Sequence, residues 1–179
     1  MIELKQEVAH VLAALAELDR RGEQKAPLMQ ALAGTMLDEV EQNFTAQGRP
    51  AWAGFAPSTL KRRKGGKLLQ DSGRLASSIT PSSDNDSAQV GTNVVYAAIH
   101  HFGGEIKRAA RSQRVYFKQS KAGEVGTRFV KKSQSNFSQW ATIGEHTQKI
   151  PARPYLVLTE AGIQEMEEQT TRYFGGLWI

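Results

Sequence analysis

The segment 105–149 limits the fold of this chain more than any other stretch, because its apolar residues are too few and too scattered to build a core. Strand-like runs at 114–118 and 127–131 flank the turn sequence KAGEVG, a pattern that predicts a β-hairpin. The polar stretch that follows holds Phe137 and Trp140 as isolated aromatic residues. We therefore expect an extended arm or a long, partly mobile loop between the core-forming parts of the chain.

The N-terminal part of the chain has the periodicity of two helices. Apolar residues recur every three or four positions over 2–20, which predicts an amphipathic helix that Arg21-Gly22 ends. A second helix begins near Pro27, ends at Gly48 and carries one apolar stripe, formed by Met29, Leu32, Met36, Val40 and Phe44. The short joint between the two helices predicts an antiparallel or bent pair.

Short strands and a further helix follow. Residues 76–81 and 88–92 are strand-like and flank a polar turn. Asn93 is placed as the N-cap of a helix that stops at Gly103, with one apolar face formed by Val95, Ile99 and Phe102. This part of the chain therefore supplies a small sheet and a middle helix.

After the arm, two prolines fix a corner at 151–154, Tyr155 to Leu158 form a short buried strand, and Thr159 caps a last helix. Residues 1–179 are thus expected to form a single α+β domain. It has a small antiparallel sheet flanked by two N-terminal helices (1–47), a middle helix and a C-terminal helix. An extended β-hairpin arm (105–149) is inserted in this core.

The charges are unevenly placed. The formal net charge is +5, yet the N-terminal 47 residues carry eight acidic against four basic residues, and the stretch from Thr159 is also acidic. The bases concentrate in two middle segments, 61–74 and 107–132. Such a distribution fits binding to nucleic acid, and it fits head-to-tail self-association equally well.

The residue types present argue against several kinds of site. Without cysteine there is no disulfide, thiolate metal site or thiol nucleophile. The glycines before Leu68 lack the spacing of a phosphate-binding loop, and Ser72 lacks the context of a nucleophile, so Asp71 and Ser72 are interpreted as caps of a helical turn. His100 and His101 point about 100° apart on a helix and cannot share a metal. We expect no catalytic, metal or cofactor site.

Four motifs occur in order along the chain. They are the Trp52 loop of PAWAGFAPSTLKRRKGGKLLQDSGRLASSI, the corner Leu69–Leu75 of the same stretch, the segment Gly91–Gly103 of VGTNVVYAAIHHFGG, and the corner Pro151–Leu156 of IPARPYLVLT. In this order they resemble the phage virion morphogenesis family, the Mu-like protein G group, from about Gly48 to the end of the chain. The arm also looks like the insertion of Mu-like members.

The resemblance implies a non-enzymatic structural subunit of phage or prophage assembly, a tail completion or neck protein at the head–tail junction. The expected partners are further copies of the chain in a ring and the tail tube or neck/connector proteins, with non-specific contact to phage DNA left open. The expected locations are the host bacterial cytoplasm during assembly and then the virion. The candidate assembly residues are Trp52, Lys61, Arg62, Arg63, Lys64, Arg74, Tyr96, His100, Tyr116, Phe117, Arg128 and Arg153.

A nucleic-acid-binding protein is the alternative that the residues leave open. The segments 61–74 and 107–132 could contact phosphates by counterion release, although no zinc-finger, basic-zipper or RNA-recognition signature accompanies them. A membrane partner is not expected, because no apolar run approaches the roughly 20 residues of a membrane span. The first ten residues also lack the pattern of a signal peptide.

Overall fold

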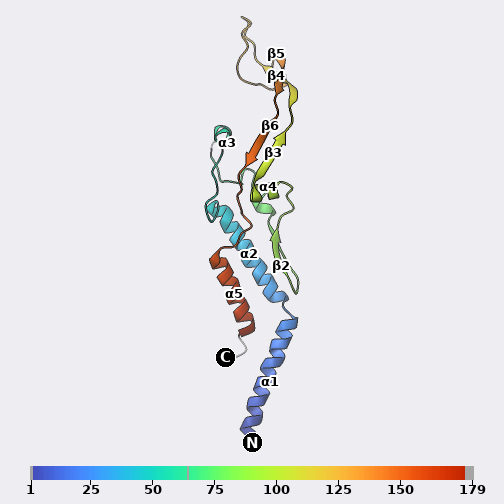
Figure 1. Cartoon of the computed structure of the whole chain (residues 1–179), viewed down its shortest axis with the longest axis vertical. Coiled ribbons are helices and arrows are strands. Elements are labelled where there is room, and N and C mark those ends of the chain that lie inside the picture. The colour runs from blue at the N-terminus through green and yellow to red at the C-terminus, as the bar shows by residue number, and fades with distance from the viewer. Residues whose placement is uncertain (1, 64, 176–179) are drawn as a thin grey trace. The chain divides into compact units, whose positions relative to one another are not determined.

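The computed structural model describes residues 2–63 and 65–175. The chain divides into two compact units, unit 1 with residues 1–103 and 151–179 and unit 2 with residues 104–150. Helices and antiparallel strand pairs both occur, which confirms the α+β class. In chain order (Figure 1), the elements are α1 (Ile2–Glu23), α2 (Ala26–Ala46), α3 (Pro57–Arg62), η1 (Ala76–Ser78), β1 (Thr80–Ser83), β2 (Ala88–Gly91), α4 (Ala97–Phe102), β3 (Gly104–Arg108), β4 (Arg111–Phe117), η2 (Lys132–Gln134), β5 (Phe137–Ile143), β6 (His146–Ile150) and α5 (Glu160–Gly175).

Helix α1 is longer than predicted and continues through Gly22 to Glu23. Its last turn is held by Arg21, whose Nε lies 2.8 Å from Glu17 Oε1 and whose Nη1 donates to the carbonyl oxygen of Tyr173. An ion pair one turn apart and a tertiary bond offset the cost of a glycine in the helix. The prediction that Arg21-Gly22 ends this helix is therefore wrong.

Helix α2 follows after a bend of two residues, so the bent form of the helix pair is confirmed (Figure 1). Pro27 lies in its first turn, and beyond its end Gln47 and Gly48 both adopt left-handed conformations, with φ of 59° and 104°. Two residues of the predicted stripe, Val40 and Phe44, are buried. The other three are half-buried, namely Met29, Leu32 and Met36.

Helix α2 is the centre of unit 1. Helix α5 and the hairpin β1–β2 both pack against it (Figure 1). The hairpin is antiparallel, with Thr80 opposite Gly91 and Ser83 opposite Ala88. The central cluster of buried side chains consists of Val40, Phe44, Trp52, Leu68, Leu75, Ile79, Val94, Ala97 and Tyr155. The loops before and after the arm therefore contribute as much to the core as the regular elements do.

The sequence predicts that Asp71 and Ser72 cap the helical turn that begins at Gly73. The Ser72 part is confirmed, because Ser72 Oγ accepts a long hydrogen bond from the backbone N–H of Arg74 (3.4 Å) and Ser77 N donates to the Gly73 carbonyl oxygen (3.0 Å). The Asp71 part is wrong, because Asp71 Oδ1 lies 3.2 Å from Arg63 Nη2. The strand predicted over 76–81 begins later than expected, at Thr80, because η1 occupies residues 76–78.

Helix α4 is shorter than predicted, and two of the three residues of its predicted apolar face are exposed. It begins four residues after Asn93, which is not its N-cap. Thr92 Oγ1 accepts a hydrogen bond from the backbone N–H of Val94 (3.2 Å), which keeps the preceding residues in a turn. Val95 is 98% exposed and Phe102 is 76% exposed. Ile99 is half-buried, so only one of the three residues of this face is directed toward the interior.

The strand predicted for Tyr155–Leu158 is also wrong, because this stretch is extended but belongs to no strand of the described structure. The Nδ2 of Asn43 donates to the carbonyl oxygens of Tyr155 (3.0 Å) and Val157 (2.8 Å). A side chain of α2 thus takes the place that a neighbouring strand would have.

Unit 2 is a two-stranded antiparallel ribbon. Strand β3 pairs with β6 and β4 with β5, and one register runs without offset from Gly104↔Ile150 to Phe117↔Phe137. The two ladders are therefore consecutive parts of one long hairpin. The hairpin predicted between 114–118 and 127–131 is wrong in its partner, since the polar stretch after residue 136 supplies the second strand.

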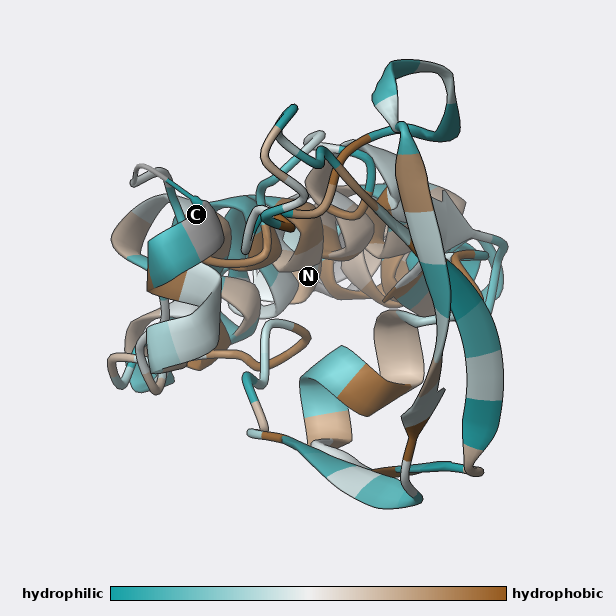
Figure 2. Cartoon of the chain, turned by 90° about the horizontal axis from the view of Figure 1, so that it is seen from above, coloured by the Kyte–Doolittle hydropathy of each residue, from teal (hydrophilic) through white to brown (hydrophobic). Residues whose placement is uncertain are grey.

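The two faces of this ribbon differ because side chains alternate along a strand. Val115 and Phe117 are buried on one face, where the ring of Phe129 lies 5.2 Å from that of Phe117. The backbone N–H of Val130 donates to the Tyr116 carbonyl oxygen (2.9 Å), so the apolar residues near 130 cover β4 without pairing as a strand. Figure 2 shows mainly teal and white strands with single brown bands, as expected for so small an apolar face.

Candidate functional site

Buried Arg153 organises one corner of unit 1. Its Nε and Nη2 donate to the carbonyl oxygens of Ala53 (2.9 Å) and Gly54 (2.8 Å), and its backbone N–H donates to the His100 carbonyl oxygen (2.9 Å). Burial lowers the pKa of the Arg153 guanidinium, while the two carbonyl dipoles compensate its charge. Arg153 thus fixes the Trp52 loop to the end of α4.

Trp52, a predicted assembly residue, lies in the core. Its Nε1 donates to the Pro154 carbonyl oxygen (3.0 Å), and its ring meets Phe44 edge-on at 5.8 Å between centroids. A side chain at Gly48 would overlap the Trp52 ring, so the glycine is needed for close approach as well as for its positive φ. Trp52 therefore shapes this corner from inside.

A polar network joins α2, the following loop and the start of α5. Arg49 donates from Nε to Asn43 Oδ1 (2.9 Å) and lies with Nη2 3.2 Å from Glu39 Oε2. The same carboxylate oxygen accepts bonds from Thr159 Oγ1 (2.6 Å) and Thr159 N (2.8 Å). Burial alone would raise the pKa of Glu39, but the Thr159 bonds and the Arg49 charge outweigh it, and the pKa is lowered. Thr159 Oγ1 also accepts from Gly162 N (3.2 Å), which confirms the predicted N-cap.

The two histidines serve different neighbours. His101 Nδ1 accepts a bond from the backbone N–H of Tyr155 (3.3 Å), and burial lowers the pKa of His101. His100 stacks edge-on against Tyr96 at 5.7 Å, and its pKa is lowered by burial and then by the charge of Arg153. Both imidazoles are therefore favoured in the neutral form.

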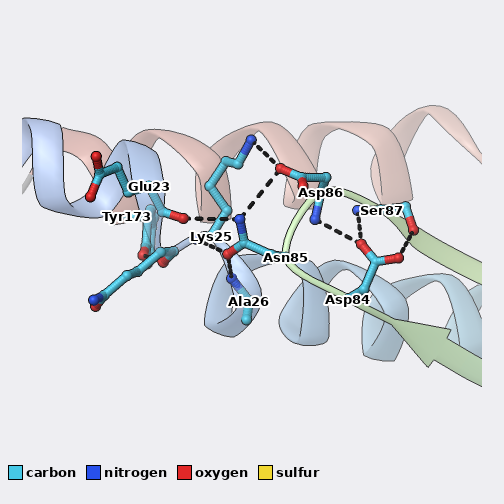
Figure 3. A network of polar contacts seen from close by, with 9 residues as sticks. Glu23, Lys25, Ala26, Asp84, Asn85, Asp86, Ser87 and Tyr173 are labelled. Atoms are coloured by element: carbon cyan, nitrogen blue, oxygen red, sulfur yellow. Dashed lines mark hydrogen bonds and ion pairs between the residues drawn. The ribbon is translucent and has the colours of Figure 1, made fainter.

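The turn of the β1–β2 hairpin holds the joint between α1 and α2 (Figure 3). Asn85 Oδ1 accepts from the backbone N–H groups of Lys25 (2.8 Å) and Ala26 (3.2 Å), and its Nδ2 donates to the Glu23 carbonyl oxygen (2.9 Å). Lys25 Nζ also lies 2.7 Å from Asp86 Oδ1. One side chain thus caps the start of α2 and the end of α1 together.

The basic segment 61–74 is only partly available for a partner. Lys61 and Arg74 are exposed, but Arg63 pairs with Asp71 and lies 5.0 Å above the Phe55 ring. The side chain of Arg62, and Lys64 as a whole, lie outside the described residues.

Unit 2 carries the remaining candidates and most of the positive charge. Phe117 is buried, Tyr116 is half-buried and Arg128 is exposed. Residues 104–150 contain ten Lys or Arg against three Glu, a balance of +7, whereas the rest of the chain has 13 bases and 15 acids, a balance of −2. The structure brings Trp52, His100 and Arg153 together in unit 1; an assembly role for the predicted residues stays a prediction.

The residues that organise this region most were not among those predicted. Asn43 is fully buried, Asn85 bonds to three backbone groups, and the Glu39 carboxylate bonds to Thr159 and pairs with Arg49. One signal was present, since Asn43 lies between Val40 and Phe44 on the apolar stripe, where a polar residue indicates a buried hydrogen bond.

Two kinds of feature are absent from the described part of the chain. Across residues 2–63 and 65–175, His, Asp and Glu side chains form no group of three that could hold a metal ion. Within the same ranges, no helix is apolar and long enough to cross a membrane. The charged residues of the corner are engaged in fixing backbone segments.

Comparison with known proteins agrees with the motif order. The profile of the phage virion morphogenesis family matches residues 6–175. The chain is 35% identical over 175 residues to the "Mu-like prophage FluMu G protein 2" of Haemophilus influenzae, covering 97% of this chain and 96% of the relative. It is 32% identical over 131 residues to the "Putative capsid assembly protein G" of Escherichia phage Mu, covering 66% and 83%. No solved structure matches it. The chain belongs to the phage virion morphogenesis family.

Proposed function

We propose that this chain is a tail completion or neck subunit, which assembles as a ring at the head–tail junction of a phage or prophage particle. Its partners are further copies of itself and the tail tube or neck/connector proteins. The subunit is made in the host cytoplasm and acts without catalysis, as a shaped part of the virion. The matched family and the relatives' names support the coarser role in virion morphogenesis.

The observation that carries the proposal is the separation of charge between the two units. A two-stranded ribbon with only Val115 and Phe117 buried is marginal when isolated in water. Such an element gains stability by packing on a partner, and its formal net charge of +7 favours an acidic surface on that partner. The other unit carries acidic helices, so copies of the chain offer each other complementary surfaces.

The test is deletion of the gene from an inducible prophage. The expected result is full heads and finished tails that fail to join, seen by electron microscopy of the lysate, with joining restored by the chain supplied from a plasmid. If infectious particles form without the gene, the proposal is wrong. If heads themselves are missing, the role lies in the capsid, as the printed name of the phage Mu relative states for that protein.

Nucleic-acid binding is the second candidate, favoured by the exposed bases of unit 2. Binding to duplex DNA through phosphates should weaken steeply with salt, with a slope that falls as bases are neutralised. Replacing Lys107, Arg108 and Arg111 by Gln should then lower both the affinity and the slope. Absence of binding at low salt would remove this candidate.

A further inference from the structure

Helices α2 and α5 enclose an open groove on unit 1. Its lining is largely apolar, its volume is about 480 Å³, and the residues around it are Leu32, Ile163, Met166, Glu167, Thr170 and Thr171. Ile163 is 38% exposed and Met166 is half-buried. A second hollow of about 520 Å³ adjoins it across Glu167 and Thr171. This α2–α5 groove is therefore apolar surface that the described residues of unit 1 leave uncovered.

The helices that form the α2–α5 groove are acidic. Together they contain seven acidic residues and a single base, Arg172. Glu167 lies in the lining of the groove, and Glu168 and Arg172 line the adjoining hollow. An occupant that combines an apolar group with positive charge therefore complements this surface.

The ribbon of unit 2 presents this combination at one place. Trp140 lies opposite Arg114 in the β4–β5 ladder, and the Arg114 guanidinium carbon lies 5.4 Å from the Trp140 ring centroid. Trp140 is 67% exposed and pairs with a base; Phe129 is 74% exposed, but its ring lies 5.2 Å from that of Phe117. Trp and Arg are the residue types that most often dominate binding energy at protein interfaces.

We propose that Trp140 and Arg114 of one copy dock into the α2–α5 groove of a second copy. The Trp140 ring covers Ile163 and Met166, and Arg114 pairs with Glu167 in the lining. The inference deepens the proposed function, because it names the surfaces through which the subunits of the ring meet.

The length of the ribbon suits a contact between copies. Ten residues separate Trp140 from the base of the ribbon at Ile150, which corresponds to about 33 Å along a strand. That reach is close to the diameter of a small domain, about 30 Å. Because the two surfaces are unlike, the contact is head-to-tail and generates a ring when its rotation closes.

The chain lacks cysteine, so introduced thiols report the contact without background. Ser138→Cys lies two residues from Trp140 on the same ribbon face and leaves the ring in place, and Thr170→Cys lies on the groove. The two variants are produced as separately tagged chains in cells that carry the gene-deleted prophage, and are then oxidised. We expect a disulfide between the two tags, which can only join different copies. Gln139→Cys is the matched control, since it lies on the opposite ribbon face and should not link to Thr170→Cys. Absence of the Ser138–Thr170 link, or linkage of Ser138→Cys to Leu12→Cys on α1 instead, would overturn the proposal.

Carrying both cysteines in one chain separates failure of the contact from failure of the ring. A ladder of covalent multimers supports head-to-tail assembly, and a product that stops at the dimer retains the contact but refutes the ring. A link confined to the monomer overturns the proposal. In parallel, Trp140→Ala should weaken self-association about 30-fold, and Glu167→Lys should do so unless combined with Arg114→Glu. If Arg114→Glu abolishes DNA binding while the cysteines never link, the ribbon serves nucleic acid.

Discussion

Replacing Asn43 with alanine should be among the most damaging single changes in unit 1. The side chain is fully buried and makes three hydrogen bonds, donating to the carbonyl oxygens of Tyr155 (3.0 Å) and Val157 (2.8 Å) and accepting from Arg49 Nε (2.9 Å). These bonds join α2 to two segments that have no regular secondary structure of their own. Their loss therefore affects packing on both sides of the helix.

The magnitude follows from what each partner can do afterwards. The Tyr155 carbonyl is left without its donor in the core, which costs about 1–3 kcal/mol. The bonds to Val157 and Arg49 reach groups with access to water, so each contributes about 1 kcal/mol. We expect Asn43→Ala to lower the free energy of unfolding by about 3–5 kcal/mol, a large part of the 5–15 kcal/mol typical of a domain.

Urea unfolding followed by far-UV circular dichroism measures this change, because the α-helices of the described chain all belong to unit 1. The matched control is Gln42→Ala, which removes an exposed bond from the same arginine (2.8 Å) and should cost at most about 0.5 kcal/mol. In an Arg49→Ala background, Asn43→Ala should cost less than in the parent. A loss below about 1 kcal/mol, or one equal to that of the control, would refute the reasoning.

Three further predictions concern the same unit and the ribbon. Burial holds the His101 pKa below its ordinary 6.5, so the free energy of unfolding should fall as pH drops from 6.5 through the pKa of the folded state. His101→Asn keeps an acceptor for Tyr155 N, and its melting temperature should change less between pH 7 and 5 than that of the parent. Gly162→Ala places a Cβ 2.5 Å from Glu39 Cδ and should cost about 1–3 kcal/mol in urea unfolding, whereas Gly22→Ala, with open space around it, should not destabilise. Replacing 107–147 by a short Gly/Ser linker should leave a helical spectrum but abolish self-association in light scattering; an unfolded product would contradict the two-unit architecture.

Local patterns predicted the elements whose causes are local. Pro27, Thr159 and the glycine at 48 mark helix ends through their own backbone or hydroxyl chemistry, and all three lie where the structure uses them. The helix end at Arg21-Gly22 was wrong because the deciding bond comes from Tyr173, 152 residues away. The spacing of residues around a helix end cannot predict a hydrogen bond to a residue so distant in the sequence.

The strand pairing of the ribbon failed for a related reason. Phe129 and Val130 have the composition of a strand, and the turn before them suggested a hairpin. In the structure they cover Phe117 and bond to β4, while the polar residues from Phe137 onward form the ladder. The ring of Phe117 is buried under residues 129–130, and β4 pairs with β5 instead. The sequence of β5 alternates too weakly between apolar and polar residues for its pairing to be predicted.

The ribbon of unit 2 combines a small buried apolar face with most of the positive charge of the chain. A ribbon with two buried apolar residues contributes little free energy to its own folding, so in the assembly that we propose docking on a partner supplies a large share of its stability. Contacts between exposed charges are screened over about 10 Å at 0.1 M salt, so the first encounter of copies is weak and reversible. In the contact that we propose, desolvation of Trp140 then decides whether two copies stay together, because burial of an aromatic ring depends far less on salt than a contact between exposed charges does. A ring built this way assembles by charge and is retained by apolar burial. Raised salt should therefore slow its formation far more than it promotes its dissociation.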